Sequence, residues 1–334
     1  MPFASLIGNE RIKKLLRRAV AEGRIGQGLI MAGPDGVGKR EFSLALAQAL
    51  NCARTADGDA CGTCLPCRKI AAAEHPDVST ISPEGQFIKV DRVREMSREV
   101  YFRPFEGRRR VFILDSAERL HPSASGALLK TLEEPPVTSV LVLVTAKPYA
   151  LLETIRSRCQ MLNFAPLTEF ELEAQLAKAS KRSTEETHLL ARLARGSIGH
   201  ALEIDLEKYR ERRLAMIELL ETMALTQDTI RLLGAAEYLG KKIERDEFVE
   251  HLDAMMVLLG DLLRLKSGGT IESLTNRDIG DSMVRLAECA TFEQITGWAD
   301  RVERILRDLA RNIGRQLAME AMLFQERARG SAPP

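Results

Sequence analysis

The chain has 334 residues, of which 28% are charged, and its formal net charge is +1. This length is sufficient for two or three domains with well-buried cores. The near-neutral balance argues against a free-standing nucleic-acid binder, which is usually distinctly basic. An aromatic content of 5% offers no obvious stacking platform for single strands.

Neither a membrane span nor a signal peptide is evident. No apolar stretch reaches the length of a span, and residues Met1–Ser5 lack a basic-then-apolar pattern. We therefore expect a cytoplasmic protein without a membrane partner. Cysteines stay reduced there, so clustered cysteines indicate metal binding or catalysis rather than disulfides.

Residues 1–166 predict an α/β domain, because strand-like apolar runs alternate with helical stretches. This alternation is typical of a parallel sheet that is covered on both faces. The expected strands are Leu29–Ala32, Val78–Ser82, Val111–Asp115, Val140–Thr145 and Met161–Phe164.

A glycine-rich loop follows the first of these strands and leads into a helical stretch over residues 39–50. It matches a P-loop: Gly33, Gly36 and Gly38 permit the tight turns that aim N–H groups at a phosphate, and Lys39 supplies a point charge. Arg40 stands where the motif needs Ser or Thr, whose hydroxyl would bind Mg²⁺. An ordinary glycine-rich turn is the alternative interpretation.

Four cysteines gather within residues 52–67 in the spacing C-x8-C-x2-C-x2-C, at Cys52, Cys61, Cys64 and Cys67. Two overlapping C-x2-C units let thiolates surround one tetrahedral ion, which favours a structural Zn²⁺ site. An iron–sulfur cluster is the main rival, because thiolates bind either. His75 is a possible further ligand, but four thiolates already complete the site.

The strand expected at Val111–Asp115 ends in an acid, as in a Walker B motif. Asp115 would face the Mg²⁺ position at the carboxyl end of the strand. Hydrolysing proteins of this type carry Glu at the next position, where this chain has Ser116, and a hydroxyl is no general base without an activating partner. For Asp115 alone, a helix N-cap remains a serious alternative.

After residue 166 the sequence predicts helices and almost no strand. Thr168 and Glu171 form a capping-box start, another helix begins near residues 183–184, and residues 196–199 interrupt the pattern before His200. We expect a small helical domain over 167–206, a second over 207–328 and a flexible tail over 329–334. The last helix is read as one stripe of apolar residues: Trp298, Val302, Ile305, Leu306, Leu309, Ile313, Leu317, Ala321 and Phe324.

Further segments carry a family resemblance: Leu6–Glu10, His75–Asp77, Ile88–Arg94, Leu128–Pro136, the motif Ser157-Arg158-Cys159, and Asn312–Glu320. Together with the P-loop and the cysteines, they resemble the clamp-loader subunits of bacterial DNA polymerase III. The resemblance is dense over residues 5–167 and implies an AAA+ domain with an inserted zinc module, a helical lid and a helical collar.

Departures from the motor pattern favour the delta prime type within this family. Gamma/tau motors keep the P-loop hydroxyl, the Walker B Glu and a lid Arg after Gly-Ser, where this chain has Gly199 or His200. These losses oppose productive Mg²⁺·ATP chemistry, although Lys39, Arg40 and the loop amides leave metal-free polyphosphate binding open. An active gamma/tau-type ATPase is the alternative, and a zinc-dependent DNA-binding module is a second one.

The resemblance also implies partners and a role for Arg158. The expected assembly is a hetero-oligomeric ring with gamma/tau and delta subunits that loads a sliding clamp onto primed DNA. In that ring Arg158 would reach the nucleotide of the neighbouring subunit as an arginine finger, and a structural salt bridge is the alternative. The run Arg108–Arg110 is expected to be a solvated turn rather than a contact to DNA phosphates.

Overall fold

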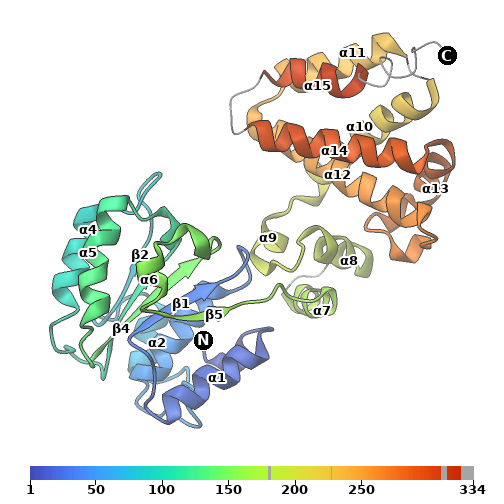
Figure 1. Ribbon diagram of the computed structural model, residues 1–334. Coiled ribbons are helices and arrows are strands. Elements are labelled where there is room, and N and C mark those ends of the chain that lie inside the picture. The colour runs from blue at the N-terminus through green and yellow to red at the C-terminus, as the bar shows by residue number, and fades with distance from the viewer. Residues whose placement is uncertain (180–181, 227, 310–313, 325–334) are drawn as a thin grey trace. The chain divides into compact units, whose positions relative to one another are not determined.

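The structure is a computed structural model that describes residues 1–179, 182–226, 228–309 and 314–324 (Figure 1). The chain divides into two compact units: residues 1–179 with 194–203 form the first, and residues 180–193 with 204–334 form the second. None of the helices in the described ranges combines the length and the apolar character needed to cross a membrane.

A parallel sheet of five strands in the order β2-β3-β4-β1-β5 forms the centre of the first unit. This confirms the predicted α/β fold with a parallel sheet. Because β1 lies between β4 and β5, the segments that follow β1, β3 and β4 meet at one edge of the sheet, where parallel sheets place ligands. The strands are β1 Gly28–Ala32, β2 Val78–Ile81, β3 Arg110–Leu114, β4 Ser139–Thr145 and β5 Gln160–Asn163.

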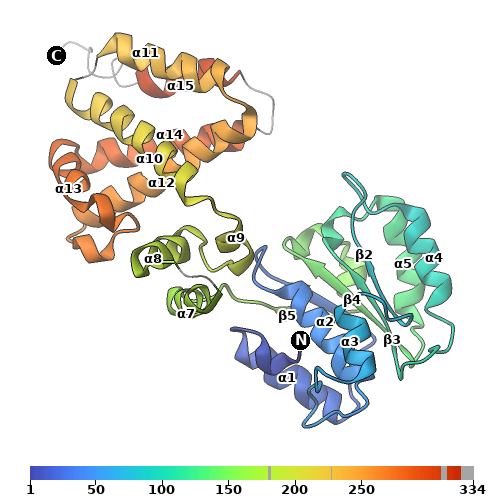
Figure 2. The same cartoon turned by 180° about the vertical axis from the view of Figure 1, so that it is seen from behind.

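Helices cover both faces of this sheet, with α4 and α5 side by side on one face and α1, α2 and α3 on the other (Figures 1 and 2). Alternation along β1 divides its side chains between the two cores: Leu29 and Met31 pack with the first three helices, and Ile30 packs with α4 and α5. The helices of the unit are α1 Glu10–Ala21, α2 Lys39–Asn51, α3 Leu65–Ala71, α4 Val90–Glu99, α5 Pro122–Glu133, α6 Glu153–Arg156, α7 Glu169–Ala179 and α9 Ile198–Glu203.

The predicted helix starts after the sheet are confirmed. The Thr168 backbone N–H donates to Glu171 Oε2 at 2.8 Å, and the Glu171 N–H donates to Thr168 Oγ1 at 3.2 Å, which is a capping box. The next helix, α8, begins at Thr184. The predicted lid thus contributes α7 and α9 to the first unit and α8 to the second, and the proposed boundaries at 166 and 206 stay predictions.

The second unit is helical, and its long helix α12 packs against α10, α13 and α14. Trp298 on α14 and Phe248 on α12 are fully buried there, so the unit has a core of its own. Its helices are α8 Thr184–Leu193, α10 Leu206–Glu221, α11 Thr229–Glu237, α12 Arg245–Lys266, α13 Gly280–Cys289, α14 Phe292–Asp308 and α15 Arg315–Phe324.

The single terminal helix predicted from the apolar stripe is wrong. The stripe is divided between α14, which ends at Asp308, and α15, which begins at Arg315, and the two helices pack against each other. Gly314 directly precedes α15, and glycine is a poor residue for a helix interior. Ile313 of the predicted stripe and the predicted tail at 329–334 lie outside the described residues.

Candidate functional site

A polar cavity of about 370 Å³ lies where the P-loop meets the carboxyl ends of β3 and β4. The structure brings five of the six predicted residues together there: Gly36, Gly38, Lys39, Arg40 and Asp115 line the cavity, whereas Gly33 does not. The charged groups around it are two cations and five carboxylates: Lys39, Arg40, Asp35, Glu41, Asp115, Glu118 and Glu203. The formal balance, two minus five, is −3, so the lining opposes an anion that arrives without a cation.

Lys39 is buried and bound to its own loop. Its Nζ donates to the carbonyl oxygens of Gly33 at 2.7 Å and Pro34 at 2.6 Å, and it lies 3.8 Å from Asp35 Oδ1. Burial, partly offset by neighbouring carboxylates, holds the pKa of Lys39 below its ordinary value. A phosphate would therefore have to compete with two backbone acceptors for this ammonium group.

The tip of the P-loop is packed against the start of α9. The Gly199 N–H donates to the Gly36 carbonyl at 3.2 Å, and a Cβ placed on Gly36 would lie 2.0 Å from Ser197 Oγ. Gly36 also has φ of 71°, in the region that favours glycine. The glycine at position 36 is thus required by packing as well as by the turn.

The two departures from the motor pattern both face this cavity. Arg40 occupies the position of the Mg²⁺-binding hydroxyl, and Ser116 lines the cavity where motors carry a carboxylate. Asp115 Oδ1 accepts the backbone N–H of the next residue, Ser116, at 3.0 Å. The N-cap of the following turn, Ala117–Arg119, is Ser116, and no side chain of the described residues caps that turn, so the N-cap alternative for Asp115 is wrong. A nucleotide role for these residues stays a prediction.

Sequence reasoning missed four polar residues of the cavity: Glu41, Glu118, Thr145 and Glu203. Thr145 is the last residue of β4 and pairs with Ala32, directly before the P-loop. A polar residue at the end of a strand beside the P-loop strand was a usable signal. Glu118 Oε2 is buried and has no hydrogen-bond partner, and no sequence spacing pointed to it.

The four predicted cysteine ligands form a compact cluster, in which all Sγ atoms lie within 4.8 Å of one another. The cluster could hold a metal ion. Backbone N–H groups point at the sulfurs: Cys61 donates to Cys52 Sγ, and Cys64 donates to Cys61 Sγ, each at 3.3 Å. Hydrogen bonds from the backbone of Thr63 and Cys64 lower the pKa of the Cys61 thiol to about 5, which favours the thiolate that a metal needs.

His75 is not part of this cluster. Its Nδ1 accepts the backbone N–H of Asp77 at 3.1 Å, and its Nε2 lies 3.6 Å from Glu106. Burial lowers the pKa of His75, which keeps the ring neutral in this structural role.

Arg158 lies two residues before β5 begins, at the amino end of that strand, whereas the P-loop lies at the carboxyl end of the neighbouring strand β1. Its guanidinium donates to Glu133 Oε1 at 2.9 Å and to the Thr154 carbonyl at 3.0 Å. Because Ala32 pairs with Asn163, the P-loop begins level with residue 164, about 20 Å along the strand from position 158. Arg158 is therefore beyond the reach of its own P-loop.

The neighbours of Arg158 are structural. Arg156 stacks over the ring of Tyr149 at 5.2 Å, and burial raises the pKa of the Cys159 thiol to about 12.

The solvated turn predicted for Arg108–Arg110 is wrong at its last residue. Arg110 begins β3 and is largely buried, with its Nη1 donating to the Glu99 carbonyl at 2.8 Å.

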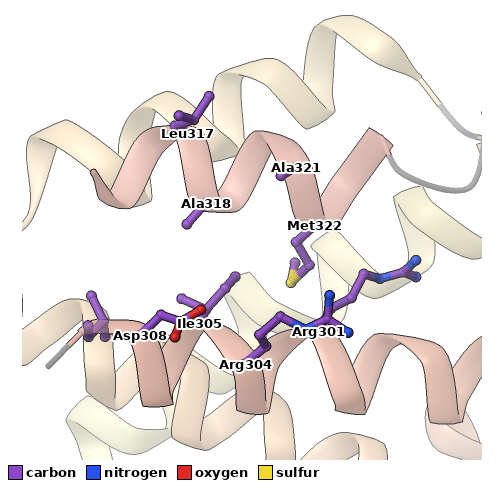
Figure 3. Close-up of a pocket in the computed structure, with 9 residues that line it drawn as sticks. Arg301, Arg304, Ile305, Asp308, Leu317, Ala318, Ala321 and Met322 are labelled. Carbon is purple, nitrogen blue, oxygen red and sulfur yellow. The ribbon is translucent and has the colours of Figure 1, made fainter. Parts of the chain in front are cut away.

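The second unit holds an apolar groove of about 230 Å³ between α14 and α15 (Figure 3). Ala318 and Met322 of α15 face Ile305 of α14 across it, and the charged groups of Arg301 and Arg304 lie at its side. No set of polar groups converges inside it, so its lining does not indicate a chemical site.

Two family models match most of the chain. Residues 8–168 match the family described as "DNA polymerase III, delta subunit", and residues 209–327 match "DNA polymerase III, delta subunit, C terminal".

Proteins with curated names agree with these models. The chain is 26% identical over 315 residues to the DNA polymerase III subunit delta' of Bacillus subtilis, which covers 94% of both chains. It is 36% identical over 192 residues to the subunit delta' of Pseudomonas aeruginosa, covering 57% of this chain and 58% of that one. Subunit tau of Escherichia coli is 32% identical over 207 residues, which are 60% of this chain and 32% of tau. The chain therefore belongs to the delta prime family of DNA polymerase III clamp-loader subunits.

Proposed function

We propose that this chain is a stator of a clamp loader: it does not turn over ATP efficiently itself, and it supplies Arg158 to the ATP site of a neighbouring subunit. The observation that carries this proposal is the position of Arg158, about 20 Å along the sheet from its own P-loop. A guanidinium at that edge can act only on a nucleotide held by another chain. There it would spread positive charge over the γ-phosphate as negative charge develops.

The cavity at the chain's own P-loop supports the proposal that this chain does not hydrolyse ATP efficiently. Arg40 and Ser116 replace the groups that would position Mg²⁺ and activate water, and Lys39 is already bound by two loop carbonyls. The excess of carboxylates weakens the case for metal-free polyphosphate binding that the sequence left open.

We further propose that the cysteine cluster holds one structural Zn²⁺. Four Zn–S bonds of about 2.3 Å in a tetrahedron separate the sulfurs by about 3.8 Å. The Sγ atoms of Cys52 and Cys64 are 3.8 Å apart, and no pair exceeds 4.8 Å. A cluster of several iron atoms would need its cysteine sulfurs further apart, so one ion fits better.

The partners in this proposal are gamma/tau and delta subunits in a hetero-oligomeric ring, with the sliding clamp and primed DNA as the ring's substrates. Similarity to delta' and tau subunits supports these partners, and a role on chromosomal DNA keeps the cytoplasm as the proposed compartment.

ATP turnover by the purified chain, beside turnover by the reconstituted assembly with primed DNA and clamp, tests the proposal. We expect no steady turnover by the chain alone. Turnover by the isolated chain that Lys39→Ala abolishes would instead support the gamma/tau-type ATPase.

A further inference from the structure

The loop between α4 and β3 exposes aromatic side chains to an unusual degree. Phe105 is 86% exposed and Phe102 is 61% exposed, with Tyr101 beside them at 51%. The neighbouring loop before β4 adds Val137, which is 69% exposed. Four side chains of this size expose on the order of a few hundred Å², the size of patch that marks interaction sites on many monomers. We name these four residues the edge patch.

The aromatic loop is held rigidly by the core. Asp77, whose side chain is fully buried, accepts backbone N–H groups from Phe105, Glu106 and Gly107 at 2.7, 2.9 and 2.8 Å. Burial would by itself raise the pKa of the Asp77 carboxyl, but these three donors and Arg110 hold it below its ordinary value.

A second buried side chain continues this support. Asn51 Oδ1, at the end of α2, accepts the N–H groups of Arg108 at 2.8 Å and Arg109 at 3.0 Å. A Cβ on Gly107 would lie 2.5 Å from the same oxygen, so the loop fits closely over Asn51. The five N–H groups bound by Asp77 and Asn51 preorganise the segment that begins at Phe105, which lowers the entropic cost of binding a partner through this side chain.

The edge patch is continuous with the edge that carries Arg158. The Arg110 N–H donates to the Thr138 carbonyl at 2.9 Å, and Ser139 Oγ donates to the Val100 carbonyl at 2.6 Å, so the two patch loops lie side by side. The loop of Val137 begins directly after α5, whose last residue, Glu133, pairs with Arg158. All these residues lie at the amino ends of the parallel strands.

We infer that the edge patch anchors the neighbouring ATPase subunit whose nucleotide Arg158 serves. This inference rests on the proposed function and adds the residues that hold the finger against its target. Arg103 and Arg108 flank the patch, both exposed, and no carboxylate in the described part of the chain pairs with either. The partner surface is therefore apolar and bordered by acidic side chains. Aromatic side chains at the centre of such a contact carry much of its binding energy.

The experiment places a tryptophan reporter in the patch of the full-length chain. Assembly of a Phe105→Trp variant with the purified gamma/tau-type ATPase subunit should shift the emission of the new residue to the blue. The matched control is Phe170→Trp on α7, where the native side chain is 79% exposed. Its emission should stay unchanged, and Trp298 is fully buried in both variants.

Binding of the same ATPase subunit gives the second measurement. Replacing Phe102 and Phe105 together by Ser should raise Kd at least about tenfold, while Phe170→Ser leaves it unchanged. A folded Phe105→Trp variant that assembles without any shift overturns the inference. A shift caused by primed DNA alone also overturns it, because the patch would then be a nucleic-acid platform.

The outcomes separate this inference from the proposed function. If Arg158→Ala slows turnover while the serine variants assemble normally, the stator role stands and the anchor is wrong. If the native chain does not bind the ATPase subunit at all, both are wrong.

Discussion

Replacing Arg158 by Ala separates a finger that acts on another subunit from a structural salt bridge. Arg158 and its partner Glu133 are 36% and 53% exposed, and an exposed pair of this kind contributes about 0.2–1 kcal/mol. Loss of the pair should therefore lower Tm by roughly 2 °C or less. Loss of a finger should slow the ATP site it serves by about 10³-fold or more, which corresponds to about 4 kcal/mol in the transition state.

The assay measures ATP turnover of the assembly on primed DNA with clamp, alongside Tm of the purified variant. Only the site that faces this chain loses its finger, so total turnover should fall by at least that site's share. Arg156→Ala is the matched control, because Arg156 lies two residues away and stacks on Tyr149. Equal turnover in the Arg158→Ala and native assemblies would refute the reasoning, and so would a fall that simply follows lost stability.

Four further changes have defined outcomes. Arg40→Thr supplies a hydroxyl for Mg²⁺ and should raise the affinity for Mg²⁺·ATP in calorimetry, so equal affinities with and without metal would contradict the P-loop interpretation. Cys61→Ser should reduce bound zinc from about one per chain in elemental analysis, and iron in the native protein would show the wrong metal was chosen. Asp77→Asn should cost about 2 kcal/mol of unfolding free energy at neutral pH. Because folding lowers the pKa of Asp77, the ionised carboxylate stabilises the fold above the unfolded pKa of about 4, and this stabilisation is lost as pH falls through the folded pKa. The unfolding free energies of the native chain and the variant should therefore converge in acid. A difference in unfolding free energy that stays constant with pH would contradict this account. Glu133→Gln frees Arg158 from its ion pair and should raise assembly turnover by up to about fivefold, whereas a fall would mean that Glu133 orients the finger.

The elements of the first unit were predictable because their signals are local. Apolar runs such as Val140–Thr145 are strands buried on both faces, and the capping pair Thr168 and Glu171 marks a helix start through contacts three residues apart. The end of the chain was not predictable in the same way. The apolar spacing continues from α14 into α15 as if they were one helix, because each of the two helices needs an apolar face for packing against the other.

The candidate sites also differ in whether their residues lie close together in the sequence. The cysteine cluster could be found from spacing, because its four ligands lie within one short segment. Glu118, Glu203 and the pairing of Arg158 with Glu133 could not be found, because they depend on how distant segments meet around the sheet. Asp77 is the clearest case, since a carboxylate that binds a loop 28 residues away has no local signature.

The contact between Gly36 and the start of α9 has a consequence for how degenerate P-loops are interpreted. Any side chain at position 36 would strike Ser197, and one at position 199 would come within 3.2 Å of the Gly36 Cα. Selection for a well-packed first unit would thus preserve this pair of glycines in a chain that had stopped handling nucleotides altogether. Glycines in a P-loop therefore do not by themselves indicate ATP hydrolysis. The informative positions are 40 and 116, where this chain lacks the Mg²⁺-binding hydroxyl and the carboxylate that activates water.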